Sequence, residues 1–422
     1  MLDRIIESFE QFLHTDVRYL AKGSFWLLVG RGSGALVAFA LSILYARYLP
    51  KELYGDYRYV LSVLGAFGIF ALPGIATVIT RGVARGFEGT FLRGSRLIFF
   101  SSFTITVLGF IAAGLFFFQG NISLAWGFII AGLLTPFAEG LGNWRAYFDG
   151  LRRFREKTFW NIITNFFQGV MMAGAVASVF FLKLSLALHI VMLVGAFYIS
   201  HALPNVMWHI YTRRRIAKEA ASEPGALRYG LKLSLLDAPS TIANYLDGIL
   251  LHMFLGPAAL AVYAFAVAPA EQLKGFLGTS ASVGLPKLSV RTKDDHSLRE
   301  LRATLPMKIF RATFFTFLLV GAYIIVAPFL YTIFFPRYRE AALFSQVFAA
   351  SLLLFPFSFF HTAILTEGNL KKVYWDKLGW PLVQIAALLV LVPFFGIWGA
   401  IIAKIIGRLF NHLVSLALFM YY

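Results

Sequence analysis

Charged residues stand inside several long apolar stretches of this sequence, and their types and positions could do chemistry. Arg31 and Lys274 each interrupt an apolar stretch. Lys404, Arg408 and Asn411 recur at helical spacing, which would place them in one polar stripe along a helix. Charge is expensive to hold in an apolar environment, so it is usually retained there for a function or a partner. These five residues are therefore candidates for binding a cargo.

Four acidic residues lie in similar surroundings, at Asp237, Asp247, Glu271 and Glu139. An apolar environment favours the protonated form of a carboxyl group, and a nearby lysine favours the ionised form. Such acids can couple a movement to protons or sodium, so we treat them as candidates for ion coupling or gating. For Asp247, a helix cap or an interhelix hydrogen bond is the competing interpretation.

Some of these charges could instead neutralise one another. Glu271 precedes Lys274 on the same face of a helix, so pairing and cargo contact both stay open for Lys274. Glu139 is expected at a depth similar to that of Arg31, which allows a second pair. No acid lies near Arg408 in the sequence, which favours cargo contact for its stripe.

The composition indicates whether these residues lie in a soluble protein or in a membrane. The chain of 422 residues is 59% hydrophobic and 14% charged, whereas a soluble domain has roughly 25% charged residues. Several apolar runs approach the roughly 20 residues that cross a membrane as a helix. No run alternates apolar and polar residues at period two, which argues against a β-barrel. We therefore predict an all-α integral membrane protein.

The apolar runs predict about twelve transmembrane helices. Their expected ranges are 24–46, 57–80, 97–118, 122–147, 158–182, 185–211, 229–254, 258–284, 305–334, 340–365, 377–394 and 397–420. We divide the chain into an amphipathic N-terminal helix on the cytoplasmic side at 1–23, a six-helix lobe at 24–211, a basic cytoplasmic linker at 212–228 and a second six-helix lobe at 229–422.

The net charge of +17 is distributed unevenly. Most of the basic residues fall in the segments that lie on the side of the N-terminus. The turns on the opposite side hold only Arg47, Lys51, Arg58, Lys183, Arg337 and Arg339. Because basic loops stay inside, both termini are expected in the cytoplasm of a cell membrane. Anionic lipid headgroups, rather than nucleic acid, are then the expected partners of the basic excess.

One turn occurs twice in the sequence. "YARYLPKELYGDY" at 45–57 and "LHMFLGPAALAVY" at 251–263 each end one apolar run and begin another. The same offset aligns Tyr57 with Tyr263 and Arg81 with Lys287. Six helices in each half give the two halves the same orientation, so we predict parallel repeats around a central cavity that opens by alternating access.

The sequence also resembles a known family. The segments "ARYLPKELYGDY", "LPGIATVITRGVARG", "FDGLRRFREKTFWNII", "LDGILLHMFLGPAALAVYAFA" and "FFPRYREAALFSQVFAASLLLFPFS" are similar to those of polysaccharide or O-antigen flippases. These belong to the multidrug/oligosaccharidyl-lipid/polysaccharide (MOP) exporter superfamily. The resemblance implies a MATE-like fold and transfer of an undecaprenyl-diphosphate-linked oligosaccharide from the cytoplasmic to the outer leaflet. Enzymes of the same polysaccharide pathway are then possible partners.

The resemblance gives the candidate residues specific roles. A diphosphate cargo would be bound by Arg31, Lys274 and the Lys404–Asn411 stripe, with arginine as the better bidentate phosphate ligand. Asp247 occupies the acidic position that recurs in the seventh helix of the family, which makes it our first choice for coupling. No cofactor is implied.

Two other functions stay open. An ion-coupled multidrug antiporter of the same superfamily would need an acid in the cavity of the N-terminal lobe, where the first helix offers Arg31. A membrane-embedded glycan polymerase or ligase would be expected to carry a large extracytoplasmic loop, whereas the outer turns are short. The scattered histidines show no metal-binding spacing such as HExxH. We therefore predict a transporter that is not an enzyme and has no metal site.

Overall fold

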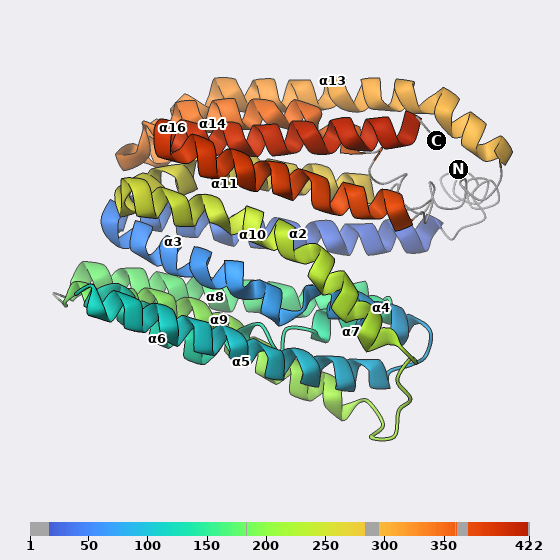
Figure 1. Ribbon diagram of the computed structural model, residues 1–422, viewed down its shortest axis with the longest axis horizontal. Coiled ribbons are helices and arrows are strands. Elements are labelled where there is room, and N and C mark those ends of the chain that lie inside the picture. The colour runs from blue at the N-terminus through green and yellow to red at the C-terminus, as the bar shows by residue number, and fades with distance from the viewer. Residues whose placement is uncertain (1–16, 183, 283–294, 359, 361–369, 421–422) are drawn as a thin grey trace.

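The computed structural model describes residues 17–182, 184–282, 295–358, 360 and 370–420, and no β-strand occurs among them. The chain forms two bundles of helices (Figure 1). The first contains α2 (Val17–Tyr48), α3 (Lys51–Ala66), η1 (Phe67–Ala71), α4 (Pro73–Ala84), α5 (Gly89–Phe118), α6 (Ile122–Ala138), α7 (Trp144–Gly150), α8 (Phe154–Phe181) and α9 (Leu186–Arg214). The second contains α10 (Ala226–Leu255), α11 (Pro257–Ser282), α13 (Asp295–Phe334), η2 (Pro336–Tyr338), α14 (Ala341–Ala350), η3 (Ser351–Phe357) and α16 (Leu370–Met420).

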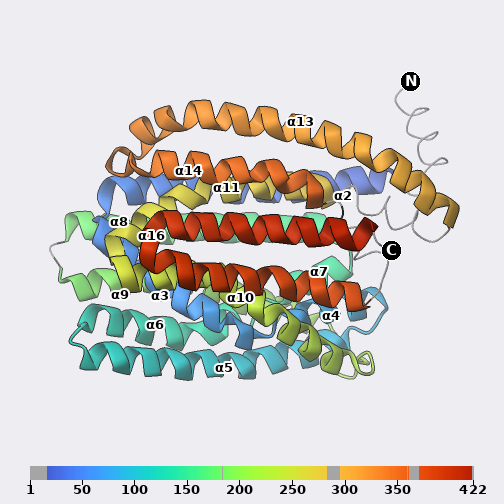
Figure 2. The ribbon, with the colours of Figure 1, turned by 45° about the horizontal axis from the view of Figure 1, so that its top comes forward.

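The long helices run between two ends of the molecule. At the end that we call the short-turn end, tight turns at Pro50, Gly120, Gly256 and Gly396 join successive helices (Figures 1 and 2). At the opposite end, the basic end, α2 begins, α16 ends, and the segment between α9 and α10 carries Arg215 and Lys218. The linker expected at 212–228 corresponds to this segment, because α9 ends at Arg214 and α10 begins at Ala226.

The second expected helix, at 57–80, is wrong in both its start and its continuity. It begins at Lys51, directly after Pro50, because the fixed backbone of proline suits the first turn of a helix. It then breaks at Leu72, which has a φ of 51° and precedes Pro73. Proline cannot continue the hydrogen-bonding pattern of the preceding turn. The two parts, Lys51–Ala71 and Pro73–Ala84, are therefore bent by 47°.

Other expected helices also differ in extent. The range 122–147 is divided into α6 and α7 by a turn that contains Gly140 and Gly142. The expected ranges 377–394 and 397–420 form the two limbs of α16, which reverses at Gly396 with a φ of 57° (Figure 2). Of the amphipathic segment expected at 1–23, residues 1–16 lie outside the described part, and α2 already begins at Val17.

Length and composition support a multi-pass membrane protein. Within the described ranges, six helices are long and apolar enough to cross a membrane, or up to seven if the bent pair of α3 and α4 forms one span. Many large apolar side chains on the outer helices are exposed, as expected for side chains that face lipid, for example Phe118, Phe310 and Phe394. The count of twelve spans stays a prediction.

The two bundles meet along α3 and α4 of the first and α10 and α11 of the second. At the short-turn end the backbones touch, because a Cβ atom added to Gly55 would lie 1.9 Å from the carbonyl oxygen of Pro257. Nearer the basic end, the backbone N–H of Gly74 donates to Ser234 Oγ at 3.0 Å. The two similar turns therefore lie side by side, although the parallel repeat itself stays a prediction.

Candidate functional site

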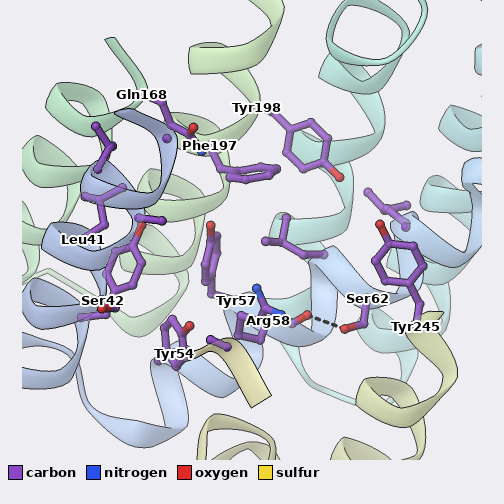
Figure 3. Close-up of a pocket in the computed structure, with 18 of the residues that line it drawn as sticks. Leu41, Ser42, Tyr54, Tyr57, Arg58, Ser62, Gln168, Phe197, Tyr198 and Tyr245 are labelled. Atoms are coloured by element: carbon purple, nitrogen blue, oxygen red, sulfur yellow. Dashed lines mark hydrogen bonds between the residues drawn. The ribbon is translucent and has the colours of Figure 1, made fainter. Parts of the chain in front are cut away.

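Arg58 on α3 lines a large cavity, which has a volume of about 440 Å³ (Figure 3). Since α3 begins at Lys51, Arg58 is carried two turns into the helix, roughly 10 Å from its start. Its side chain is half-buried, and its Nε atom has no hydrogen-bond partner among the described residues. A guanidinium group carries five N–H donors and stays charged. Arg58 therefore brings a positive charge, with one unsatisfied N–H group, to the wall of the cavity.

The walls of the cavity come mainly from the first bundle. Helices α2, α3, α6, α8 and α9 contribute most of the lining, and the second bundle contributes Tyr245 and Ala268. The cavity therefore lies where the two bundles meet. A ligand held there would contact both bundles, which is the arrangement needed if binding is to influence their relative position.

Tyrosine rings and neutral polar groups surround Arg58. The aromatic lining consists of Tyr45, Tyr54, Tyr57, Phe197, Tyr198 and Tyr245. Gln168 and Asn165 of α8 lie in the same wall. Asn165 donates to Ser33 Oγ at 3.5 Å, whereas the side chain of Gln168 has no hydrogen-bond partner among the described residues. Tyrosine offers an apolar ring together with a hydroxyl group that donates and accepts. Such a wall suits a ligand that has both apolar faces and many hydroxyl groups.

Arg58 was missed as a site residue by the sequence interpretation. We assigned it to an outer turn, because the expected helix began at Tyr57. Two signals in the sequence point to an earlier start, namely Pro50 and the acidic Glu52 in the first turn. With the helix begun at Lys51, Arg58 joins the set of cations inside apolar helices.

Asp247 and Lys404 form a buried ion pair. Lys404 Nζ lies 2.5 Å from Asp247 Oδ2, and the two side chains are 14% and 6% exposed. The hydroxyl group of Tyr263 also donates to Asp247 Oδ2, and the backbone N–H of Gly248 donates to Oδ1 at 2.8 Å. The carboxylate of Asp247 is thus bound by α10, α11 and α16 of the second bundle.

Glu271 joins two of the other predicted cations. It forms ion pairs with Arg408 and, at 3.5 Å, with Lys274. Arg408 also donates to Ser351 Oγ at 2.6 Å. No acid lies near Arg408 in the sequence, but the fold brings α11 beside α16 and so places Glu271 against Arg408. The contact of Lys274 with Glu271 agrees with the pairing interpretation, and cargo contact stays open for the exposed Lys274.

Lys274, Arg408 and Asn411 line a second, smaller cavity of about 180 Å³ in the second bundle. The side-chain oxygen of Asn411 is buried there without a hydrogen-bond partner in the described part of the chain. The polar stripe predicted on the last helix therefore does face a cavity. Lys404, one turn before Arg408, is directed to Asp247 instead.

The remaining candidates lie apart from one another. The guanidinium group of Arg31 lies against Gly275 of α11, next to Lys274 in the chain. Glu139 lines the large cavity with Arg58. Asp237 forms a half-exposed ion pair with Lys377 at 2.7 Å. Within the described ranges, no group of three His, Asp or Glu side chains could hold a metal ion.

Comparison with known proteins gives the chain a family. Residues 20–291, more than half of the chain, match the family model described as polysaccharide biosynthesis protein. No curated protein sequence matches the chain.

Solved structures with a similar fold are membrane transporters. An outward-facing multidrug resistance transporter of the MATE family, in the MOP superfamily, has a TM-score of 0.62 at 13% identity, over 96% of this chain and 94% of its own. A MOP superfamily transporter from Pyrococcus furiosus, described by the reverse polarity of its binding pocket, has a TM-score of 0.63 at 13% identity, over 96% and 95%. The lipid II flippase MurJ in an inward closed conformation has a TM-score of 0.63 at 15% identity, over 94% and 87%. The chain belongs to the polysaccharide biosynthesis protein family and has the all-helical fold of MOP superfamily transporters.

Proposed function

We propose that this protein flips a lipid-diphosphate-linked oligosaccharide across the cell membrane by alternating access. The observation that carries the proposal is Arg58, a cation with an unsatisfied Nε atom in a cavity between the two bundles. Membership of a polysaccharide biosynthesis family and the fold shared with a lipid II flippase support it. The undecaprenyl carrier is the lipid that the sequence resemblance implies.

The cavity has the groups that each polar part of such a cargo needs. Arg58 can donate two parallel hydrogen bonds to phosphate oxygens, and these charge-assisted bonds strengthen away from bulk water. The apolar faces of sugar rings can pack on Tyr57 and Phe197, while Gln168 hydrogen-bonds to their hydroxyl groups. The lipid chain would remain in the bilayer beside the helices.

We assign a second, weaker binding site for the diphosphate to Arg31, Lys274 and Arg408. Arg31 of the first bundle lies against Gly275, next to Lys274 of the second. Lys274 is exposed, with 46% of its side chain accessible. Glu271 neutralises part of this charge, so an incoming phosphate would compete with a carboxylate. Arg58 has no described ion pair of this kind, which makes it the stronger site.

One observation favours a second candidate function. Glu139 places an acid in the wall of the same cavity, which is lined mainly by the first bundle, and such an acid is the feature that an ion-coupled multidrug antiporter needs. A MATE family multidrug transporter is among the structures of similar fold. Under this alternative, Glu139 rather than Arg58 would contact a cationic compound.

Ligand binding to the purified protein separates the two candidates. A ligand that binds only the folded state raises its thermal midpoint. We expect farnesyl diphosphate to stabilise the wild-type protein, farnesol to stabilise it much less, and Arg58→Ala to lose the difference. Stabilisation by tetraphenylphosphonium instead, lost in Glu139→Gln and retained in Arg58→Ala, would favour the antiporter and contradict the flippase.

The direction of transport depends on which end faces the cytoplasm. The positive-inside rule places the basic end inside. Because the chain has no cysteine, single cysteines can be introduced without background. We expect Lys51→Cys and Arg337→Cys to react with an impermeant thiol reagent added outside intact cells, and Arg85→Cys and Arg214→Cys to react only after permeabilisation. The reverse pattern would invert the proposed orientation and the direction of export.

A further inference from the structure

A buried histidine–aspartate contact joins the two bundles at the short-turn end. His252 Nε2 on α10 lies 2.8 Å from Asp56 Oδ1 on α3, and the two side chains are only 13% and 11% exposed. The His252 ring is stacked on Tyr59, with 3.9 Å between the ring centroids and 17° between the planes. Since an ionised carboxylate only accepts hydrogen bonds, Nε2 is the donor. The imidazole is thus held by two groups of the opposite bundle.

This contact is one of several that hold the two bundles together at the short-turn end. Gly55, next to Asp56, packs against the carbonyl oxygen of Pro257. Nearby, Lys51 pairs with Glu340 at 2.6 Å and Arg337 donates to the carbonyl oxygen of Leu49 at 3.3 Å. Opening this end requires α3 to separate from α10, which would break the contact and return both side chains to water.

We propose that His252 and Asp56 form a proton-binding site that closes the short-turn end. A neutral imidazole that donates from Nε2 takes up its second proton at Nδ1, and histidine is the side chain that ordinarily does so between pH 5 and 8. Protonation turns the hydrogen bond to the Asp56 carboxylate into a hydrogen-bonded ion pair, and the charged ring also gains from the face of Tyr59. Both interactions exist only while the bundles touch. Protons taken up at this end therefore favour the closed state.

The other charged and titratable groups on the neighbouring helices are placed or paired differently, so we assign the proton-binding site to His252 and Asp56. On α3, Glu52 is exposed at the helix start, Lys51 forms an ion pair with Glu340, and Arg58, two residues after Asp56, lines the large cavity. On α10, Asp247 forms an ion pair with Lys404 and accepts a hydrogen bond from Tyr263 of α11. The facing parts of the other helices, 97–118 of α5, 122–138 of α6 and 378–403 of α16, contain no charged residue. On α9, His189 contacts the backbone oxygen of Leu182 and His201 that of Phe197, while His209 lies near the opposite end of the helix, which finishes at Arg214.

The proposal goes beyond cargo binding, and its test uses no cargo. Spin labels on cysteines at Gln119 of the first bundle and Phe394 of the second, both exposed at the short-turn end, report its opening by double electron–electron resonance in lipid nanodiscs. We expect the ratio of short (closed) to long (open) distances to rise about five- to tenfold from pH 8 to pH 5. This is the gain expected when the imidazole that faces the carboxylate of Asp56 becomes positively charged.

His252→Gln keeps an N–H donor for Asp56 and cannot bind the second proton, so its ratio should be independent of pH. Asp56→Asn should also lose the pH response. His189→Gln is the matched control, because it makes the same change at the same end without a contact between the bundles, and it should respond like the wild type. An unchanged pH response in His252→Gln, or no response in the wild type, would overturn the proposal whatever the cargo is.

Discussion

Arg58→Ala is expected to reduce export of lipid-linked glycan about 10- to 100-fold in cells that lack any other flippase. Each charge-assisted hydrogen bond to a phosphate contributes about 1.5–3 kcal/mol, which corresponds to that range of affinity. Arg58→Lys should recover only part of the loss, because an ammonium group cannot reproduce the two parallel bonds of a guanidinium group. Surface glycan measures the export, and the lipid-linked precursor should accumulate on the inner leaflet.

The control for Arg58 is a positive charge outside the cavity. Arg96 on α5 is exposed near the basic end, so Arg96→Ala should leave export unchanged while removing the same formal charge. Normal export with Arg58→Ala, at normal protein level, would contradict the cargo-binding assignment. Arg408→Ala should have a weaker effect on cargo than Arg58→Ala, since Glu271 already neutralises Arg408.

Hydropathy predicted the all-helical class and most of the long helices, because the cost of exposing backbone groups to lipid forces long apolar runs into helices. It also divided the last two helices at Gly396, where the structure reverses with a positive φ. It could not place the break at Leu72, which lies within an apolar stretch and changes direction through its backbone angles rather than its hydropathy. The proline after Leu72 was a usable signal for that break.

The sequence predicted which charged residues form the candidate site better than it predicted the ion-pair partners of those residues. The rule that charges inside apolar helices have a function or a partner identified Asp247, Lys404 and Arg408, and the structure gives each of them a partner. Those partners are far apart in the sequence, so no spacing rule reveals them. Arg58 was missed for a local reason, an error in where its helix begins, and it is the cation that lines the large cavity.

Breaking the pair of Asp247 and Lys404 on one side only is expected to destabilise the protein by about 3–5 kcal/mol, because the charge left behind is buried and unpaired. Both Asp247→Asn and Lys404→Met should therefore lower the thermal midpoint measured by fluorescence-detected size exclusion. Glu340→Gln, which breaks the exposed pair with Lys51, is the matched control and should cost less than about 1 kcal/mol.

The double variant Asp247→Asn with Lys404→Met distinguishes the roles left open for this pair. Removing both charges leaves no unpaired charge, so most of the lost stability should return. If Asp247 only holds α10 against α16, the stable double variant should export glycan at nearly the wild-type rate. If Asp247 carries the coupling ion, the double variant should fold and fail to export. A double variant destabilised by as much as the two single variants together would show that the two charges act independently, and would contradict the pairing on which both roles depend.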